Sequence, residues 1–237
     1  MQNPSVKLIR RVILFASSSI ILLWSIHIIS WITGYSFAHY GIYPREWHGM
    51  LGILTAPLVH ADFQHLLSNS FPFFVLTGII YFFYKSVAIP SFVLIYLLTG
   101  FTVWLFARPV YHIGASGVVY GLISFILFSG IFRRNIKSIV LALSVTVLYS
   151  GYFYGLVPLK DGVSWESHLF GALVGVLIAF IFKEIIEDDE LTHDPFAGEQ
   201  YESKQFYLPR DAFDKTLEQR KIDEQFRINQ ELQNENF

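Results

Sequence analysis

The chain has 237 residues, of which 53% are hydrophobic, 15% are charged and none is cysteine. Soluble domains average about 25% charged residues, so the composition argues against a soluble protein, and the lack of cysteine excludes a disulfide framework and a thiol nucleophile. Residues 187–237 carry 14 acidic and 6 basic side chains, whereas residues 1–186 carry 5 acidic and 11 basic ones. We therefore expect a membrane domain over residues 1–186 and a polar acidic cytoplasmic tail, partly helical or disordered, over residues 187–237.

Six apolar segments follow one another along the first 186 residues, and a helix needs about 20 apolar residues to cross the hydrocarbon core of a bilayer. They cover residues 12–33, 66–84, 89–107, 115–132, 139–157 and 167–182. No clear small-x-small cleavage site follows the first segment, so we interpret it as a retained span and not as a cleaved signal peptide. The sequence thus predicts an all-α polytopic membrane protein, a six-transmembrane-helix bundle.

Basic residues in the connections between these spans predict the orientation of the bundle. With six spans, one side of the membrane receives eight Lys and Arg residues and the other receives three. Positively charged connections stay in the cytoplasm, so we expect both termini to be cytoplasmic. The connection over residues 34–64 is long, and its Trp, Tyr and Leu content indicates that it lies partly in the membrane interface. The sequence shows no signature of nucleic-acid binding.

Polar residues open three of the spans. His65 and Asn69 lie at the start of the second span, Ser116 at the start of the fourth and His168 at the start of the sixth. These spans all run inward from the non-cytoplasmic side, so we expect the four side chains at a similar depth on one face of the protein. Polar groups in membrane spans are energetically costly and call for a functional reason.

The four residues form a complete set for nucleophilic catalysis. A serine hydroxyl needs an adjacent base, and His168 can act on Ser116 as general base and then as general acid. Glu166 would point elsewhere on a helix, so we expect a Ser–His dyad and not a triad. His65 and Asn69 are four residues apart, share one helix face and can both donate hydrogen bonds to an oxyanion, as can the backbone N–H of Ser116.

Glycines on two of these spans predict close packing between them. Gly117 and Gly121 are four residues apart on the fourth span, and Gly171 and Gly175 have the same spacing on the sixth. Small residues at this spacing let membrane helices approach closely, which a hydrogen bond between the fourth and sixth spans requires. Tyr120 lies one helical turn from the candidate nucleophile, on the same face, where its ring can stack on the imidazole of the base.

Each motif by itself has a structural explanation. A Gly-x-Ser-Gly stretch in an apolar protein can serve helix packing alone, and a membrane histidine can be only a hydrogen-bonded structural group. The spacing of His60 and His65 does not put both rings on one helix face and no acidic ligand is obvious, so we expect no metal and no other cofactor. A transporter or channel would place polar groups near the span centres, whereas these lie at the outer ends.

Together the motifs resemble those of the rhomboid family of intramembrane serine proteases, over about residues 40–182. The carrying motifs are Gly114-Ala115-Ser116-Gly117 with Tyr120-Gly121, His168-Leu-Phe-Gly171-Ala-Leu-Val-Gly175, and His60-x4-His65-x3-Asn69. The chain departs from the family pattern at Arg45-Glu46-Trp47, where many members have Trp-Arg, and at Ser167, where Ala or Gly is frequent.

The resemblance implies a role for each of the matching residues. It implies that Ser116 is the nucleophile, that His168 is the base, that His65 and Asn69 lie around the oxyanion hole, that Tyr120 packs on the base, and that Gly114 and Gly171 are motif glycines. It implies cleavage of transmembrane protein substrates near the non-cytoplasmic face, with substrate entering from the lipid bilayer past a movable fifth span. The compact six-span form fits a bacterial plasma membrane. A catalytically silent relative that binds membrane clients is the alternative, although such a relative would be expected to lack the nucleophile or the base.

Overall fold

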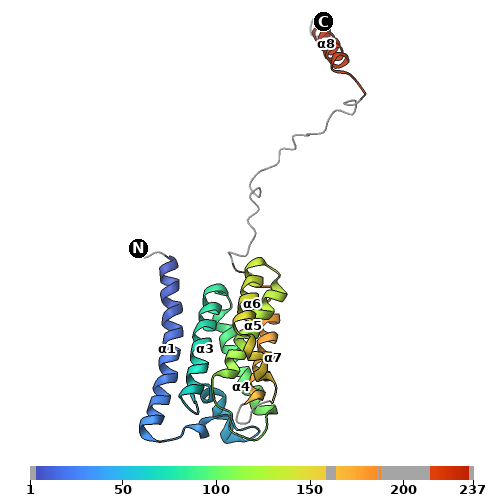
Figure 1. Cartoon of the computed structure of the whole chain (residues 1–237). Coiled ribbons are helices and arrows are strands. Elements are labelled where there is room, and N and C mark those ends of the chain that lie inside the picture. The colour runs from blue at the N-terminus through green and yellow to red at the C-terminus, as the bar shows by residue number, and fades with distance from the viewer. Residues whose placement is uncertain (1–3, 159–163, 186, 188–213, 235–237) are drawn as a thin grey trace. The chain divides into compact units, whose positions relative to one another are not determined.

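The computed structural model describes residues 4–158, 164–185, 187 and 214–234, and it divides into two compact units, residues 1–192 and 193–237 (Figure 1). Helices dominate the described residues of both units, and these residues contain no β-strand beyond a single bridge between Ile42 and His112. The predicted domain boundary at residue 186 lies close to residues outside the described ranges and stays a prediction.

The first unit is built from long apolar helices. Its main helices are α1 (Pro4–Thr33), α3 (Phe63–Phe83), α4 (Ala88–Phe106), α5 (Ser116–Arg133), α6 (Ile136–Leu148) and α7 (Trp165–Ile181). Four of them, α1, α3, α4 and α5, are long and apolar enough to cross a membrane. The predicted all-helical membrane class is therefore confirmed, and the protein is an integral membrane protein.

The fifth and sixth predicted spans differ from simple helices. The segment predicted over residues 139–157 breaks after α6, and the chain continues at an angle of 69° as the 3-10 helix η4 (Ser150–Leu156). Gly151 and Gly155 lie in this segment, and glycine weakens a helix because of its backbone freedom. The apolar helix α7 has 17 residues, fewer than the approximately 20 needed to cross a bilayer. The count of six spans stays a prediction.

Short helical turns fill the long connection between α1 and α3. They are η1 (Ala38–Tyr40), η2 (Trp47–Leu51), α2 (Gly52–Thr55) and η3 (Ala56–Leu58). The connection packs against α4, and Arg45 donates hydrogen bonds from its backbone N–H to Trp104 O and from Nη1 to Ala107 O. Trp47 is 82% exposed, as expected for a residue at a membrane interface, although its lipid contacts stay a prediction.

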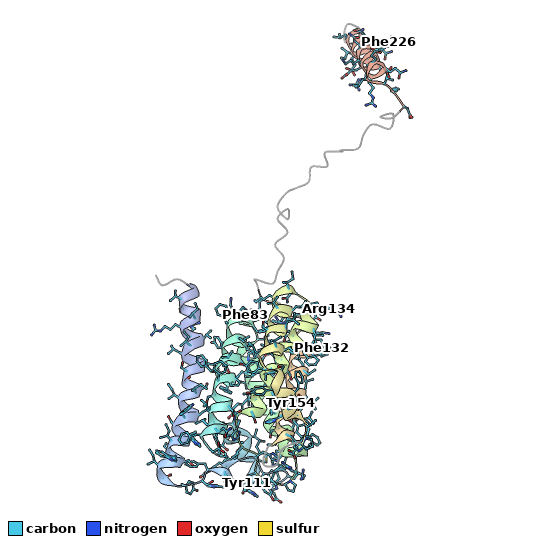
Figure 2. The ribbon with its side chains drawn as sticks, in the orientation of Figure 1. Phe83, Tyr111, Phe132, Arg134, Tyr154 and Phe226 are labelled. Carbon is cyan, nitrogen blue, oxygen red and sulfur yellow. The ribbon has the colours of Figure 1, made fainter. Side chains whose placement is uncertain are left out.

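Helix α5 is the centre of the bundle. It packs against α3, α4, α6 and α7, whereas α1 lies along α3 (Figure 1). Leu122, Phe125 and Ile126 on α5 are fully buried in the apolar core that these helices form. Figure 2 shows Tyr111, which precedes α5, at the opposite end of the bundle from Arg134, which follows it. The N-terminal end of α5 therefore lies at one end of the bundle.

The second unit contains the helix α8 (Leu217–Asn234), with five exposed apolar side chains, including Phe226 (Figure 2). The predicted polar tail over residues 187–237 falls largely outside the described residues and stays a prediction. The cytoplasmic position of this tail stays a prediction.

The predicted glycine contact between α5 and α7 is present. A Cβ atom added to Gly171 would overlap the carbonyl oxygen of Gly117, and one added to Gly175 would overlap that of Gly121. The two backbones thus touch directly at two successive turns, with no room for a side chain between them. This contact fixes the distance between the first turns of α5 and α7.

We predict that Gly171→Ala lowers the free energy of unfolding by about 1–3 kcal/mol, because the added methyl group overpacks a backbone contact. Gly78→Ala on α3 is the matched control, because a Cβ there would meet only Val12 Cγ1, at 3.9 Å. SDS titration of the protein in mild-detergent micelles measures both values. Equal stability of the two variants would contradict the proposed contact.

Candidate active site

Ser116 and His168 form a hydrogen-bonded pair between two helix N-termini. Ser116 is the first residue of α5, His168 lies in the first turn of α7, and the distance from Ser116 Oγ to His168 Nε2 is 2.9 Å. Both side chains are at least nine-tenths buried. The two residues that the sequence predicts as nucleophile and base are therefore in contact.

The backbone of η4 determines which nitrogen of the His168 ring carries the proton. His168 Nδ1 lies 2.8 Å from the carbonyl oxygen of Gly155, and a carbonyl can only accept a hydrogen bond. Nδ1 must therefore be protonated, which leaves Nε2 of the neutral ring with a lone pair. The Ser116 hydroxyl donates to this lone pair, the arrangement that a general base requires.

A left-handed turn at Gly114 leads into the Ser116 helix. Gly114 has φ +103°, a conformation that favours glycine, and its N–H donates to Ala56 O. The next N–H, of Ala115, donates to Nε2 of the buried His60 at 3.4 Å. The first helical hydrogen bond runs from Val119 N–H to Ala115 O, so the N–H of Ser116 has no carbonyl partner within α5.

Two side chains of α3 face this turn. A Cβ on Gly114 would lie 2.6 Å from His65 Nε2 and 3.5 Å from Asn69 Nδ2, so both nitrogens lie against Gly114, two residues before Ser116. Asn69 is buried, and its Nδ2 has no hydrogen-bond partner among the described residues. Asp62 caps α3 by accepting from the His65 N–H at 2.8 Å and so fixes the start of the helix. The Asn69 amide is therefore a buried donor that is available to a group bound at the Gly114 turn.

Tyr120 lies against the His168 ring. Its ring stacks on the His168 imidazole with centroids 4.2 Å apart and planes 9° from parallel. Its hydroxyl donates to Tyr152 O at 2.6 Å, which ties α5 to η4. A Cβ on Gly155 would overlap the Tyr120 hydroxyl, so only glycine fits where the chain passes the stacked rings.

Among the described residues, no carboxylate is hydrogen-bonded to the His168 ring, whose partners are Gly155 O and Ser116 Oγ. Glu166 is buried and pairs through Oε1 with Nε of Arg108 at 3.0 Å. The Glu166 side chain therefore binds the loop before α5. The Gly155 carbonyl accepts the hydrogen bond from His168 Nδ1 that a carboxylate accepts in a catalytic triad. The predicted Ser–His dyad stays a prediction.

The structure brings together all the predicted site residues and adds others that sequence reasoning missed. The predicted ones are Ser116, His168, His65, Asn69, Tyr120, Gly114, Gly117 and Gly171, and the added ones are Tyr152, Gly155, Arg108, His112 and Ser164. Tyr152 and Gly155 act through backbone carbonyls, which no side-chain pattern reveals. Within the described ranges, no three His, Cys, Asp or Glu residues converge as a metal site would require.

Comparison with known proteins gives one family. A model of the Rhomboid domain matches residues 46–185, a range that contains all the residues of the site. An uncharacterized protein of Mycobacterium tuberculosis is 34% identical over 169 residues, which cover 68% of this chain and 70% of that protein. The Bacillus subtilis protein named "Putative rhomboid protease YdcA" is 29% identical over 161 residues, 63% of this chain and 73% of its own. A rhomboid-named protein of Acanthamoeba polyphaga mimivirus is 30% identical over 143 residues, 56% of this chain and 75% of its own.

We predict that His60 makes the stability of the protein depend on pH. Burial, together with the nearby His65 ring, lowers the pKa of His60 from 6.5 to about 3, so the folded protein keeps the ring neutral. Between these pH values the unfolded chain binds more protons, so stability is full above about pH 6.5 and falls as the pH decreases. His60→Gln removes the titration and keeps an acceptor for Ala115 N–H.

The expected result is a free energy of unfolding that rises from pH 5 to pH 7 more steeply in the wild type than in His60→Gln. One group contributes a slope of at most about 1.4 kcal/mol per pH unit. SDS titrations at several pH values measure the two slopes, and identical slopes would show that His60 does not titrate in this way.

Proposed function

Because the chain belongs to the rhomboid family, we propose that it is an intramembrane serine endopeptidase with Ser116 as nucleophile and His168 as general base. The observation that carries the proposal is the 2.9 Å hydrogen bond from Ser116 Oγ to His168 Nε2 within a helical apolar domain. The name of the Bacillus subtilis relative supports the same activity. An intact dyad favours a protease over a silent family member that only binds membrane clients.

In the proposed reaction, Ser116 Oγ attacks the carbonyl carbon of the scissile peptide bond while its proton moves to His168 Nε2. The ring then becomes an imidazolium, and its Nδ1–H remains hydrogen-bonded to Gly155 O. Nε2 next gives its proton to the leaving amine as the C–N bond breaks. The same Nε2 then takes a proton from water as the water oxygen attacks the ester carbon, and it gives this proton to Ser116 Oγ as the ester C–O bond breaks, which releases the acid product.

The oxyanion of each tetrahedral intermediate needs preorganised donors. We assign this role to Asn69 Nδ2, His65 and the backbone N–H of Ser116, because the two side chains flank Gly114 and the N–H opens α5. The amide of Asn69 has no other partner among the described residues, so it needs no rearrangement before it donates. Donors of this kind contribute most where water is excluded.

The proposed substrates are transmembrane segments of other membrane proteins, cleaved near the non-cytoplasmic face. The protein and its substrates meet within the lipid bilayer, and the proposed location is a bacterial plasma membrane with both termini in the cytoplasm. The resemblance to rhomboid proteases implies a small residue before the scissile bond. Helix-weakening residues nearby are expected as well, because a helical segment must unwind to expose its carbonyl to Ser116.

We predict that Ser116→Ala and His168→Ala each lower the rate of cleavage at least about 10³-fold in liposomes that contain a model transmembrane substrate. Ser129→Ala is the matched control, because Ser129 is also buried on α5 and its hydroxyl has no partner among the described residues. Substrate fragments separated on gels give the rates. A fluorophosphonate probe should label the wild type and Ser129→Ala but not Ser116→Ala.

Cleavage by Ser116→Ala at the wild-type rate would reject the proposed nucleophile. A folded wild type that neither cleaves any substrate tested nor reacts with the probe would reject the enzyme itself.

We predict that Asn69→Leu lowers kcat about 10²–10³-fold and leaves KM nearly unchanged, since an oxyanion donor acts mainly in the transition state. Thr77→Val is the control on the same helix, because Thr77 is buried and its hydroxyl has no partner among the described residues. Steady-state kinetics in liposomes separates kcat from KM. An unchanged kcat for Asn69→Leu would remove Asn69 from the oxyanion site.

A further inference from the structure

A second Ser–His pair lies beside the candidate dyad. His112 Nδ1 is hydrogen-bonded to Ser164 Oγ, and 52 residues separate the partners, as they do in the Ser116–His168 pair. His112 precedes Ser116 by four residues, and Ser164 precedes His168 by four. The two pairs therefore join the same two chain segments, with the serine and the histidine exchanged between them.

The proton direction in the second pair follows from a backbone carbonyl, as it does in the dyad. His112 Nε2 lies 3.0 Å from Arg108 O, which can only accept, so Nε2 carries the hydrogen. Burial lowers the pKa of His112, which favours the neutral ring. Nδ1 is then an acceptor, and the Ser164 hydroxyl donates to it. Ser164 Oγ in turn accepts from the hydroxyl of Ser167, 2.6 Å away.

Two further interactions fix the segments that carry the His112–Ser164–Ser167 hydrogen bonds. His112 is 2% exposed and exchanges two backbone hydrogen bonds of 2.9 Å with Ile42, so its position is tied to the connection before α3. The Arg108–Glu166 ion pair joins the same two segments. In this ion pair Glu166 is buried and Arg108 is about half exposed, so two links join the segments: this pair and the partly buried His112–Ser164 hydrogen bond.

Ser167 connects this chain to the dyad. It directly precedes His168, and a Cβ on Gly117 would lie 3.0 Å from Ser167 O and 3.5 Å from Ser167 Cβ. Ser167 thus packs against the residue that follows Ser116. Ser164 is the N-cap residue of α7, yet its side chain makes no capping hydrogen bond. Its hydroxyl is hydrogen-bonded to His112 instead.

We propose that His112, Ser164 and Ser167 form a positioning clamp that sets the distance between Ser116 and His168. The clamp rests on the proposed protease function, because its effect is on the reactivity of Ser116. Both reacting groups lie at helix starts, where few backbone hydrogen bonds hold the chain, and a misplacement of 1 Å lowers a rate by about 10²-fold. The clamp joins the two helix starts one turn before the reacting atoms.

The test compares Ser164→Ala, Ser164→Thr, His112→Leu and the Ser164→Ala/His112→Leu double variant with wild type. Ser129→Ala is again the control for loss of a serine hydroxyl. The measurements are kcat and KM in liposomes, the rate at which a fluorophosphonate labels Ser116, and the midpoint of thermal unfolding.

The clamp predicts that Ser164→Ala lowers kcat and the labelling rate about 10-fold or more, with KM within about twofold of wild type. Ser164→Thr keeps the hydroxyl and should restore most of the activity. The double variant should be no slower than the slower single variant, because both changes break the same bond.

Several outcomes would overturn the clamp. The first is an unchanged kcat and labelling rate in Ser164→Ala, and the second is a loss of kcat in the double variant that equals the sum of the single-variant losses. The third is a loss of kcat that parallels a lower unfolding midpoint and is not restored in Ser164→Thr. Labelling of Ser164 in Ser116→Ala would instead make the second pair a nucleophilic site. If the probe labels the wild type but the wild type cleaves no substrate, the endopeptidase proposal is rejected, and the labelling rates of the variants still test the clamp. If the probe does not label the wild type, both proposals are rejected.

Discussion

The structure of the site depends on the direct backbone contact between α5 and α7. Gly171 lies against the Gly117 carbonyl and Gly175 against the Gly121 carbonyl, so the helices approach as closely as two helices can. In lipid, apolar side chains gain little by leaving the bilayer, and close packing of small residues is a main force for helix association. Because the contact begins one residue from Ser116, it brings the serine hydroxyl within hydrogen-bond distance of His168.

Backbone carbonyls take the role that acidic side chains have in many serine hydrolases. Gly155 O holds the His168 ring and Arg108 O holds the His112 ring, each through a single N–H group. An ionised carboxylate within a membrane protein is expensive to bury, whereas a carbonyl that has left a regular helix needs a donor anyway. The break between α6 and η4 frees such carbonyls, since both Tyr152 and Gly155 accept side-chain hydrogen bonds there. The irregular segment is thus part of the site.

Membership of the rhomboid family and the geometry of the site are two independent observations. The family match extends over residues 46–185 and says that this chain shares a domain with its relatives. The geometry places the Ser116 hydroxyl against His168 Nε2, Gly155 O against His168 Nδ1, and the Asn69 amide, which has no partner among the described residues, against Gly114. Activity requires both the domain and this local arrangement, and family members that lack the arrangement would not be expected to cleave peptides.

The sequence by itself determined the membrane class, and it predicted close packing of the fourth and sixth spans and four polar side chains at the starts of the second, fourth and sixth spans. Hydropathy and the Gly-x3-Gly spacing carry this information, because they depend only on the kinds of residues and on helical geometry. Only the tertiary structure decided which groups orient the rings of His168 and His112. These groups are the backbone carbonyls of Gly155 and Arg108, which a pattern of side chains in the sequence does not reveal. It also decided that Glu166 pairs with Arg108, and that His112 meets Ser164, because these contacts join residues far apart in the chain and depend on how the loops fold over the helix ends.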